Sequence, residues 1–290
     1  MLDAIEASSY NSISATAEAL AIGRRVIERL SPNGYLSGDR DYHLLKEEER
    51  SQDMMCALCR KERPLRKSHI IPEFVFKLLY DNKHKFHLLS AIPTKGNAKL
   101  QKGIRENLLC QECETSFSKY ERYVCGVLTG QENIHSVRKG RIVTVSGLDY
   151  KKFKLFLLSV LWRAGVSTLD FFESVKLGTH EEILRKMLFA ENPGPPDQYG
   201  FLMAPLVVRD VVQTDIIVKP SWSRYQGHFC YRFVFGGIIW VCFVSKYRPP
   251  ELARKAFLSL EGKAVMLVSE MESVSFIMRL AQDLVHMGRA

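Results

Sequence analysis

The apolar positions of this chain follow two different periods along its length. Outside the region of the paired cysteines, helical spacing predicts four helices, over residues 14–30, 150–165, 179–190 and 273–287. The segment 150–165 is apolar nearly all round, which is typical of a buried helix. The link 191–200 ("ENPGPPDQYG") then interrupts the helical pattern, because three prolines and two glycines in ten residues prevent regular structure.

Beyond residue 200 the pattern changes to short runs of branched and aromatic residues. These runs predict β-strands within residues 207–218, 228–245 and 264–269. The run 228–245 is predicted to form a hairpin that turns at Gly236 and Gly237, because paired glycines supply the positive φ of a tight turn. The fold class predicted for the chain is therefore α+β.

Charge divides the chain into three parts. Residues 1–54 are predicted to be a helical segment and an acidic link, residues 55–130 a cysteine-containing module, and residues 131–290 a region of helices followed by strands. Residues 1–55 carry 6 Lys and Arg against 10 Asp and Glu, a net charge of −4, whereas residues 56–125 carry 14 against 7, a net charge of +7. Such basic density attracts phosphate backbones, although a well-solvated surface gives the same pattern.

Composition favours an ordinary soluble protein, with 46% hydrophobic and 25% charged residues. The longest strongly apolar run is "LFLLSVLW" from Leu155, which is far shorter than the roughly 20 residues that a membrane-spanning helix needs. The N-terminus lacks the basic start and apolar block of a secretory signal. We therefore expect a cytoplasmic protein that does not enter membranes.

Four of the seven cysteines form two Cys-x-x-Cys pairs, Cys56 with Cys59 and Cys110 with Cys113. A tight turn lets both thiolates of such a pair reach one ion, so the two pairs make a complete tetrahedral set for a structural zinc ion. The 50 residues between the pairs imply that the metal joins the two ends of an inserted structure. The alternative is two unrelated buried or redox pairs. The remaining cysteines lie in apolar stretches and are predicted to be core residues; they are Cys125, Cys230 and Cys242.

The residues around these pairs form a recognisable series. "SHIIP" follows the first pair, with His69 between the basic stretch "RPLRK" and Pro72. "ENLLC" leads into the second pair, with Asn107 three residues before Cys110 and Glu114 directly after Cys113. This order resembles the HNH, or ββα-metal, endonuclease family, whose members carry a "DHIxP"-like strand between two Cys-x-x-Cys pairs. The resemblance covers residues 55 to about 128, roughly a quarter of the chain.

The resemblance implies a role for each matching residue. His69 would be the general base, Asn107 an orienting residue, and Glu114 the ligand of a catalytic Mg²⁺ or Mn²⁺ ion. An imidazole of near-neutral pKa can accept a proton from the water that attacks a phosphodiester, while a hard cation neutralises charge on the phosphate. Two departures stand against the match. Ser68 replaces the usual Asp before the histidine, and Glu114 replaces the usual His or Asn, although "SHIIP" with "CxxCE" resembles a bacterial variant of the family.

The segment between the pairs is rich in lysine. Its runs "KHKFHLL" and "KLQKGI" predict two strands whose polar faces present cations to nucleic-acid phosphates. The candidate nucleic-acid-binding residues are Lys95, Lys99, Lys102 and Arg105. No helix carries obvious base-reading residues, so the residues indicate no sequence specificity.

The helix predicted after the second pair has an apolar stripe at Phe117, Tyr120, Val124 and Leu128. A second stripe beside it contains Glu114, Ser118 and Glu121. Because Glu121 lies about 10 Å farther along the helix axis than Glu114, the two carboxylates are too far apart to share one ion, and Glu121 is expected to be solvated or salt-bridged.

Three functions are compatible with these features. The first is a metal-dependent endonuclease acting on nucleic acid, with double-stranded DNA as the expected substrate. The second is a zinc-stapled nucleic-acid-binding protein without cleavage activity. The third extends the first: residues 131–290 would bind a regulatory ligand or a partner protein and control the nuclease. The protein could act as an oligomer or as a single chain. The resemblance implies a bacterial setting, such as antiviral defence.

Overall fold

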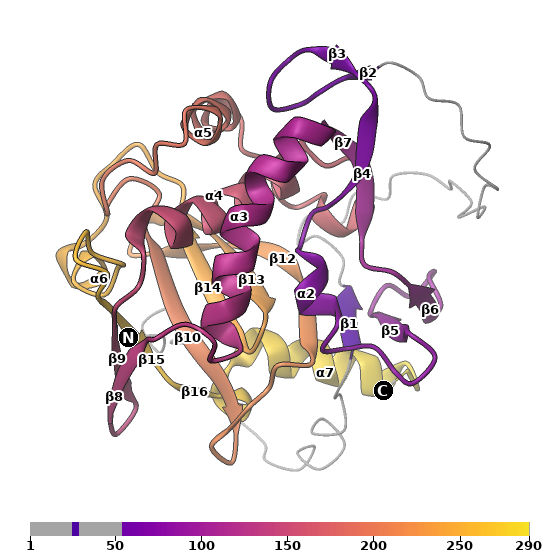
Figure 1. Ribbon diagram of the computed structural model, residues 1–290. Helices are drawn as coiled ribbons and strands as arrows, with labels where there is room; N and C mark the ends of the chain where they lie inside the picture. Colours follow the sequence, from indigo (N-terminus) through magenta and orange to yellow (C-terminus); the bar gives the residue numbers. More distant parts are fainter. Residues whose placement is uncertain (1–24, 29–53, 290) are drawn as a thin grey trace.

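The computed structural model describes residues 25–28 and 54–289 of the chain (Figure 1). It is a mixed α and β structure with a large sheet at its centre. The strands are β1 Arg25–Glu28, β2 Met54–Met55, β3 Glu62–Arg63, β4 Leu65–His69, β5 Lys85–Ser90, β6 Ala98–Gln101, β7 Arg105–Cys110, β8 His135–Lys139, β9 Ile142–Ser146, β10 Phe201–Val208, β11 Val211–Val212, β12 Ile216–Tyr225, β13 His228–Phe235, β14 Ile238–Phe243, β15 Ala264–Leu267 and β16 Ser269–Glu270. The helices are α2 Glu73–Phe76, α3 Gln111–Leu128, α4 Tyr150–Val166, α5 Thr179–Phe189, α6 Glu251–Arg254 and α7 Ser275–His286, with short 3₁₀ turns η2 Asp170–Phe172 and η3 Met271–Ser273.

The large sheet has 12 strands among the described residues. Its order is β6-β5-β1-β12-β13-β14-β10-β15-β9-β8, with β11 and β16 paired beside β10. The strands β12, β13 and β14 form an antiparallel meander, and β1 runs parallel to both of its neighbours. Two small two-stranded sheets, β2–β3 and β4–β7, lie apart from it.

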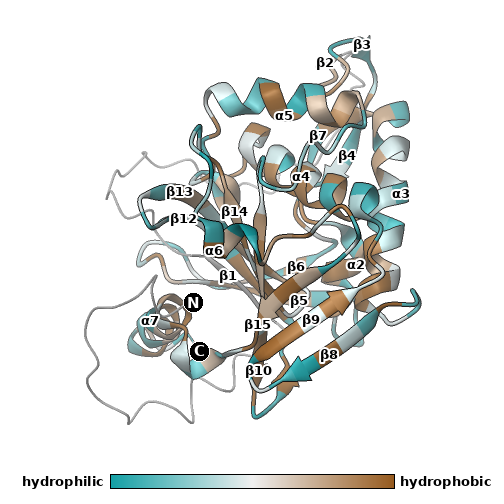
Figure 2. Cartoon of the chain, turned by 90° about the vertical axis from the view of Figure 1, so that its left-hand side faces the viewer, coloured by the Kyte–Doolittle hydropathy of each residue, from teal (hydrophilic) through white to brown (hydrophobic). Residues whose placement is uncertain are grey.

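Helices cover both faces of the sheet, with α3 and α4 on one side and α7 on the other (Figures 1 and 2). The alternation of side chains along β13 explains this arrangement. Tyr231, Phe233 and Phe235 belong to the core that includes α3 and α4, whereas Cys230 and Val234 belong to the core beneath α7. A strand that is apolar on both faces requires a cover on each side.

Most of the predicted elements in the second half of the chain are confirmed. The helix predicted over 150–165 is α4, and the one over 179–190 is α5. The hairpin of β13 and β14 turns at Gly236 and Gly237, whose φ values are 61° and 77°. The run 207–218 divides into the end of β10, β11 and the start of β12.

The helix predicted over residues 14–30 is wrong for the part that the structure describes. Residues 25–28 form strand β1, which pairs with β5 on one side and with β12 on the other. Backbone hydrogen bonds to two neighbours, together with the β-branched Val26 and Ile27, favour the strand over the helix. The rest of that segment and the acidic link 37–53 lie outside the described residues.

The cysteine-containing module packs directly against the C-terminal region. The hairpin of β5 and β6 joins the large sheet through β1, and one hydrophobic core includes residues from Cys56 to Ala264. The division at residues 54 and 130 stays a prediction, but the core is continuous across residue 130. Within the described residues, no helix combines the length and the hydrophobicity needed to cross a bilayer.

Candidate functional site

The four cysteines of the two Cys-x-x-Cys pairs meet at one point. Cys56 and Cys59 lie in the turn between β2 and β3, Cys110 ends β7, and Cys113 lies in the first turn of α3. Their sulfur atoms all lie within 4.8 Å of one another, and the Sγ atoms of Cys59 and Cys110 are 3.9 Å apart. Tetrahedral zinc with Zn–S bonds of about 2.3 Å would place its sulfurs about 3.8 Å apart. The donor set therefore fits a structural metal ion such as zinc.

Backbone hydrogen bonds shape the first Cys-x-x-Cys turn. The N–H of Arg60 donates to the carbonyl of Cys56 at 2.9 Å, and the N–H of Cys56 donates to the carbonyl of Lys61 at 2.9 Å. Arg60 has a φ of 60°, so the chain reverses through a left-handed residue immediately after Cys59. The N–H of Cys110 donates to the sulfur of Cys56 at 3.3 Å, which ties the second pair to the first.

The thiols of the cluster differ in acidity. Burial raises the pKa values of Cys56 and Cys113. Burial also acts to raise the pKa of Cys110, but hydrogen bonds from the Cys113 N–H and from the neighbouring thiols lower it to about 7. Cys110 is the N-cap of α3, and a helix N-terminus favours a thiolate. A bound cation would extend this preference to all four sulfurs.

The residues next to the cluster lie on two antiparallel strands followed by a helix. Strand β4 pairs with β7, and β7 runs directly into α3. A register shift between Arg66 and Lys67 marks a bulge in the ladder. Beyond it the register pairs Lys67 with Asn107, Ser68 with Glu106, and His69 with Arg105. Consecutive residues of a strand point to opposite faces, so Ser68 and His69 face different surroundings.

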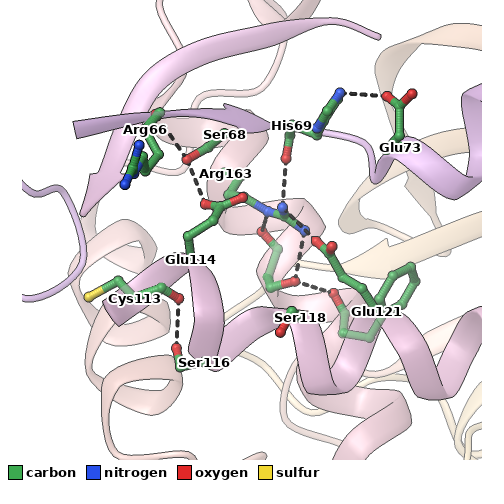
Figure 3. A network of polar contacts seen from close by, with 12 residues as sticks. Arg66, Ser68, His69, Glu73, Cys113, Glu114, Ser116, Ser118, Glu121 and Arg163 are labelled. Atoms are coloured by element: carbon green, nitrogen blue, oxygen red, sulfur yellow. Dashed lines mark hydrogen bonds and ion pairs between the residues drawn. The ribbon is translucent and has the colours of Figure 1, made fainter. Parts of the chain in front are cut away.

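Ser68 and Glu114 are in direct contact. The Ser68 side chain is fully buried, and its hydroxyl donates to the Oε2 atom of Glu114 at 2.7 Å (Figure 3). Glu114 lies in the first turn of α3, where a carboxylate is favoured by the helix dipole. Ser68 and Glu114, the two positions at which the sequence differs from the HNH pattern that it resembles, are thus joined by a hydrogen bond.

His69 contacts a different carboxylate. Its Nε2 atom lies 2.6 Å from Oε2 of Glu73 in α2, and the Tyr80 hydroxyl donates to the other oxygen of Glu73 at 2.8 Å. With the proton on Nε2, the Nδ1 atom carries the lone pair. Burial lowers the pKa of His69, and the charges of Arg105 and Arg163 lower it further against the opposing effect of Glu73. The imidazole is therefore neutral near pH 7.

The loop before β7 approaches His69 closely at Gly103. A Cβ atom at this position would lie 2.5 Å from a ring carbon of Phe76 and 2.9 Å from Cδ2 of His69. Only glycine fits there without displacing one of the two rings. The imidazole is thus held between Glu73 on one side and the Gly103 backbone on another.

The three residues assigned by the resemblance are not assembled around one point. The ring of His69 is directed toward Glu73, whereas the carboxylate of Glu114 is directed toward Ser68 on the other side of β4 (Figure 3). Asn107 is exposed and lies opposite Lys67 in the ladder. His69 and Asn107 share one face of the strand pair, while Glu114 approaches the other.

Glu121 is salt-bridged, as one of the two expectations for it stated. Its Oε1 atom lies 2.8 Å from Nη1 of the buried Arg163 in α4. Burial raises the pKa of Glu121, and the Arg163 charge opposes that shift. Glu121 is therefore part of the internal structure behind β4.

Two of the lysines predicted to bind nucleic acid are already paired within the protein. Lys95 lies 3.1 Å from a carboxylate oxygen of Asp170, and Lys99 lies 2.9 Å from one of Asp81. The two predicted strands are confirmed as β5 and β6, with Lys99 on β6 and Lys95 in the loop between the strands.

Lys102 and Arg105 lie closer to His69. Lys102 is exposed just before Gly103, with a φ of 67°. Arg105 is half-buried on β7 directly opposite His69. Of the four predicted cations, Arg105 pairs with His69 in the ladder, and Lys102 adjoins Gly103, which approaches the His69 ring.

The sequence analysis missed three residues of this site: Glu73, Tyr80 and Arg163. Glu73 and Arg163 each had a weak signal in the sequence. Glu73 follows His69 by four residues and begins a short helix after Pro72. Arg163 ends the apolar run that begins at Leu155 in α4, and a buried charge there must find a partner. Tyr80 had no local signal, since its role depends on the fold of the chain around Glu73.

Comparisons with protein-family models, with curated proteins and with solved structures found no match to this chain. The conclusions about the site therefore rest on its own geometry. That geometry establishes a four-cysteine cluster able to hold a metal ion, next to a strand-strand-helix unit that carries two carboxylate-linked side chains, Ser68 and His69.

Proposed function

We propose that this protein is a metal-dependent endonuclease that hydrolyses phosphodiester bonds of nucleic acid at the unit formed by β4, β7 and α3. The observation that carries the proposal is the pairing of His69 with Glu73. His69 lies on β4, which pairs with the strand that ends at Cys110, and Arg105 lies opposite His69 in that ladder. A neutral imidazole backed by a carboxylate is a common general base. The order of motifs shared with HNH endonucleases supports the same assignment.

In this proposal His69 accepts the proton of the attacking water at Nδ1. Glu73 holds the opposite nitrogen, orients the ring and stabilises the imidazolium that results, and Tyr80 fixes Glu73 in turn. Arg105 is positioned to bind a phosphate oxygen beside the ring. Asn107, on the same face, would orient the substrate or the loop near it.

Glu114 is the residue that would hold a catalytic Mg²⁺ or Mn²⁺ ion. Such an ion would neutralise charge on a phosphate bound beside Glu114. Because the His69 ring is directed toward Glu73 on the other side of β4, one of the two side chains would have to reorient before both could act on the same phosphate. Magnesium keeps several waters and often uses only one or two carboxylates, so the single carboxylate of Glu114 fits in part. The hydroxyl of Ser68 already donates to Glu114, and a cation there would require that hydrogen bond to rearrange.

The four cysteines are proposed to hold one structural zinc ion. Zinc would tie the turn between β2 and β3 to the junction of β7 and α3. It would therefore fix the relative position of β4, which carries His69, and α3, which carries Glu114.

The decisive experiment is a cleavage assay on supercoiled plasmid and on RNA, with Mg²⁺, with Mn²⁺ and with EDTA. Nicking or cutting with either metal and none with EDTA is the expected result. Substrate that stays intact under all conditions would reject the nuclease and leave binding to be measured.

The second candidate is a zinc-stapled nucleic-acid-binding protein without cleavage activity. The hydrogen bond from Ser68 to Glu114 favours this second candidate. HNH endonucleases usually carry an aspartate metal ligand at the position of Ser68, whereas here Ser68 donates to the remaining metal ligand, Glu114. A mobility-shift assay on the same substrates separates the two candidates, since this one predicts binding that does not depend on added Mg²⁺ and yields no product.

A further inference from the structure

A buried arginine lies directly behind the strand that carries His69. Arg163 in α4 is 0% exposed, and its Nη1 atom donates to the backbone carbonyl of His69 at 2.6 Å (Figure 3). The same nitrogen lies 2.8 Å from a carboxylate oxygen of Glu121 in α3. One guanidinium therefore joins three elements, α3, α4 and β4.

The orientation of this guanidinium is fixed by its own helix. Its Nε atom donates to the carbonyl of Ser159 at 3.3 Å, its Nη2 atom donates to the Ser159 hydroxyl at 3.2 Å, and the ring of Phe117 lies 5.5 Å away. Because a guanidinium is planar and presents its donors in a rigid fork, these contacts determine the direction in which Nη1 points.

Stability alone does not account for an arginine at this position. Helix α4 is otherwise almost entirely apolar where it is buried, and a well-packed apolar pair is often as stable as a buried ion pair. An apolar pair could not replace the hydrogen bond from Arg163 to the His69 carbonyl, and this bond fixes the backbone at the last residue of β4. The end of α4 also holds β7, because Ser167 donates to Glu106 at 2.7 Å.

We propose that Arg163 is a positioning residue that fixes the end of β4 through the His69 carbonyl and thereby holds the imidazole against Glu73. The C-terminal region is then part of the catalytic apparatus. This inference rests on the proposed function in one respect, that His69 acts as the base. Arg163 itself contacts neither the imidazole nor a substrate.

The electrostatic setting of His69 provides a readout that a merely structural role would not change. The charged and titratable groups that face it are Glu73 on α2, Arg105 on β7 and Arg163 on α4, with Tyr80 behind Glu73. Burial lowers the pKa of His69 most, and the Arg163 charge lowers it further. Loss of that charge should therefore raise the pKa of His69.

The experiment compares three variants of the full chain. Arg163→Met combined with Glu121→Met removes the charge and the hydrogen bond while keeping apolar volume. Arg163→Lys keeps the charge but lacks the planar fork. Lys219→Met is the control, because Lys219 is also a buried cation paired with a carboxylate, Glu173 at 3.0 Å.

Two measurements are made on each variant. Imidazole NMR of histidine-labelled protein follows the titration of His69, whose signal is assigned by its absence in His69→Ala. Plasmid cleavage with Mn²⁺ is recorded against pH. In the double variant the His69 pKa should rise, the acid limb of the cleavage profile should move to higher pH, and the maximum rate should fall about tenfold or more through misplacement of the base.

The remaining variants sharpen the assignment. Arg163→Lys should keep the His69 pKa close to that of the wild type while its rate falls, and Lys219→Met should leave the His69 titration unchanged. An unchanged titration and an unchanged rate in the double variant would overturn the inference. If the wild type cuts no substrate with either metal, the nuclease proposal fails, and the NMR titration still decides whether Arg163 acts on His69.

Discussion

The cysteine cluster and the polar site beside it lie on the same strands and helix, yet they are built differently. The first pair of cysteines lies in a tight turn and the second in the first turn of α3, and these two local structures bring all four sulfurs within 4.8 Å of one another. The polar site has its groups on both faces of β4, and each group is held by a partner from another element, Ser68 by Glu114 and His69 by Glu73.

This difference teaches what kind of site short motifs can specify. A closed metal centre requires only that the ligands converge, and two Cys-x-x-Cys turns ensure most of that convergence. A general base requires a supporting residue, a fixed ring orientation and a tuned pKa, and these depend on residues far away along the chain. Each prediction below acts on one side of this contrast.

The largest effect is expected at the cluster. Cys110→Ser removes one of four ligands, and metal binding in structural zinc sites supplies about 10–16 kcal/mol of folding free energy, so this variant should be insoluble or unfolded. Elemental analysis and circular dichroism measure the effect, with Cys125→Ser, outside the cluster, as the control. Folded wild-type protein that contains no zinc would show that the four cysteines do not form a structural zinc centre.

The second largest effect is expected on the rate of cleavage, in a variant that still folds. His69→Ala should reduce cleavage by a factor of about 10² or more, while zinc content and the folded state stay intact. His87→Ala, an exposed histidine on β5, is the matched control. Cleavage by His69→Ala at the wild-type rate would mean that "SHIIP" serves only as a structural strand.

Glu114→Gln tests the proposed metal ligand, which lies on the side of β4 opposite the His69 ring. It should also impair cleavage, but through weaker metal affinity, so that excess Mn²⁺ restores part of the activity. The same excess should not rescue His69→Ala. Equal responses of the two variants to Mn²⁺ would contradict the separate roles assigned to them.

A smaller effect with a definite sign is expected at Glu73. Its carboxylate raises the pKa of His69 against the lowering effect of burial, so Glu73→Gln should lower that pKa. The base then stays unprotonated to lower pH, and the acid limb of the cleavage profile should move to lower pH while the rate falls. This shift is opposite to the one expected on loss of Arg163, and a shift of the same sign in both variants would refute the electrostatic account.

The smallest expected effect is on the salt dependence of nucleic-acid binding, and it distinguishes Arg105 from Lys99. Arg105→Gln should lower the logarithmic salt slope of nucleic-acid binding by roughly one unit, since one phosphate contact is lost. Lys99→Gln should change the slope less, because Asp81 already neutralises that ammonium. Fluorescence anisotropy at several salt concentrations measures both slopes, and a larger change for Lys99 would move the binding surface to β5 and β6.

The parts of the fold that local pattern determines could be predicted from the sequence. The apolar helix α4, the hairpin at Gly236 and Gly237 and the two cysteine turns each depend on residues close in the chain. Strand β1 could not be predicted, because the helical spacing of its segment is overridden by pairing with strands that lie 62 and 191 residues away along the chain. Arg163 could be seen as a charge in an apolar helix, but its acceptor, the His69 carbonyl, depends on tertiary packing.

Strand β1 has a consequence for any attempt to dissect this protein. It is the only link, in the described residues, between β5 and β12, so the four residues Arg25–Glu28 join the β5–β6 hairpin to the rest of the sheet. A truncation that starts at residue 54 would keep every cysteine and every residue of the proposed site. It would also expose two unpaired strand edges in the interior of the sheet, which invite aggregation. The shortest fragment that folds like the full chain should therefore begin upstream of residue 25, although all the cysteines lie beyond residue 54.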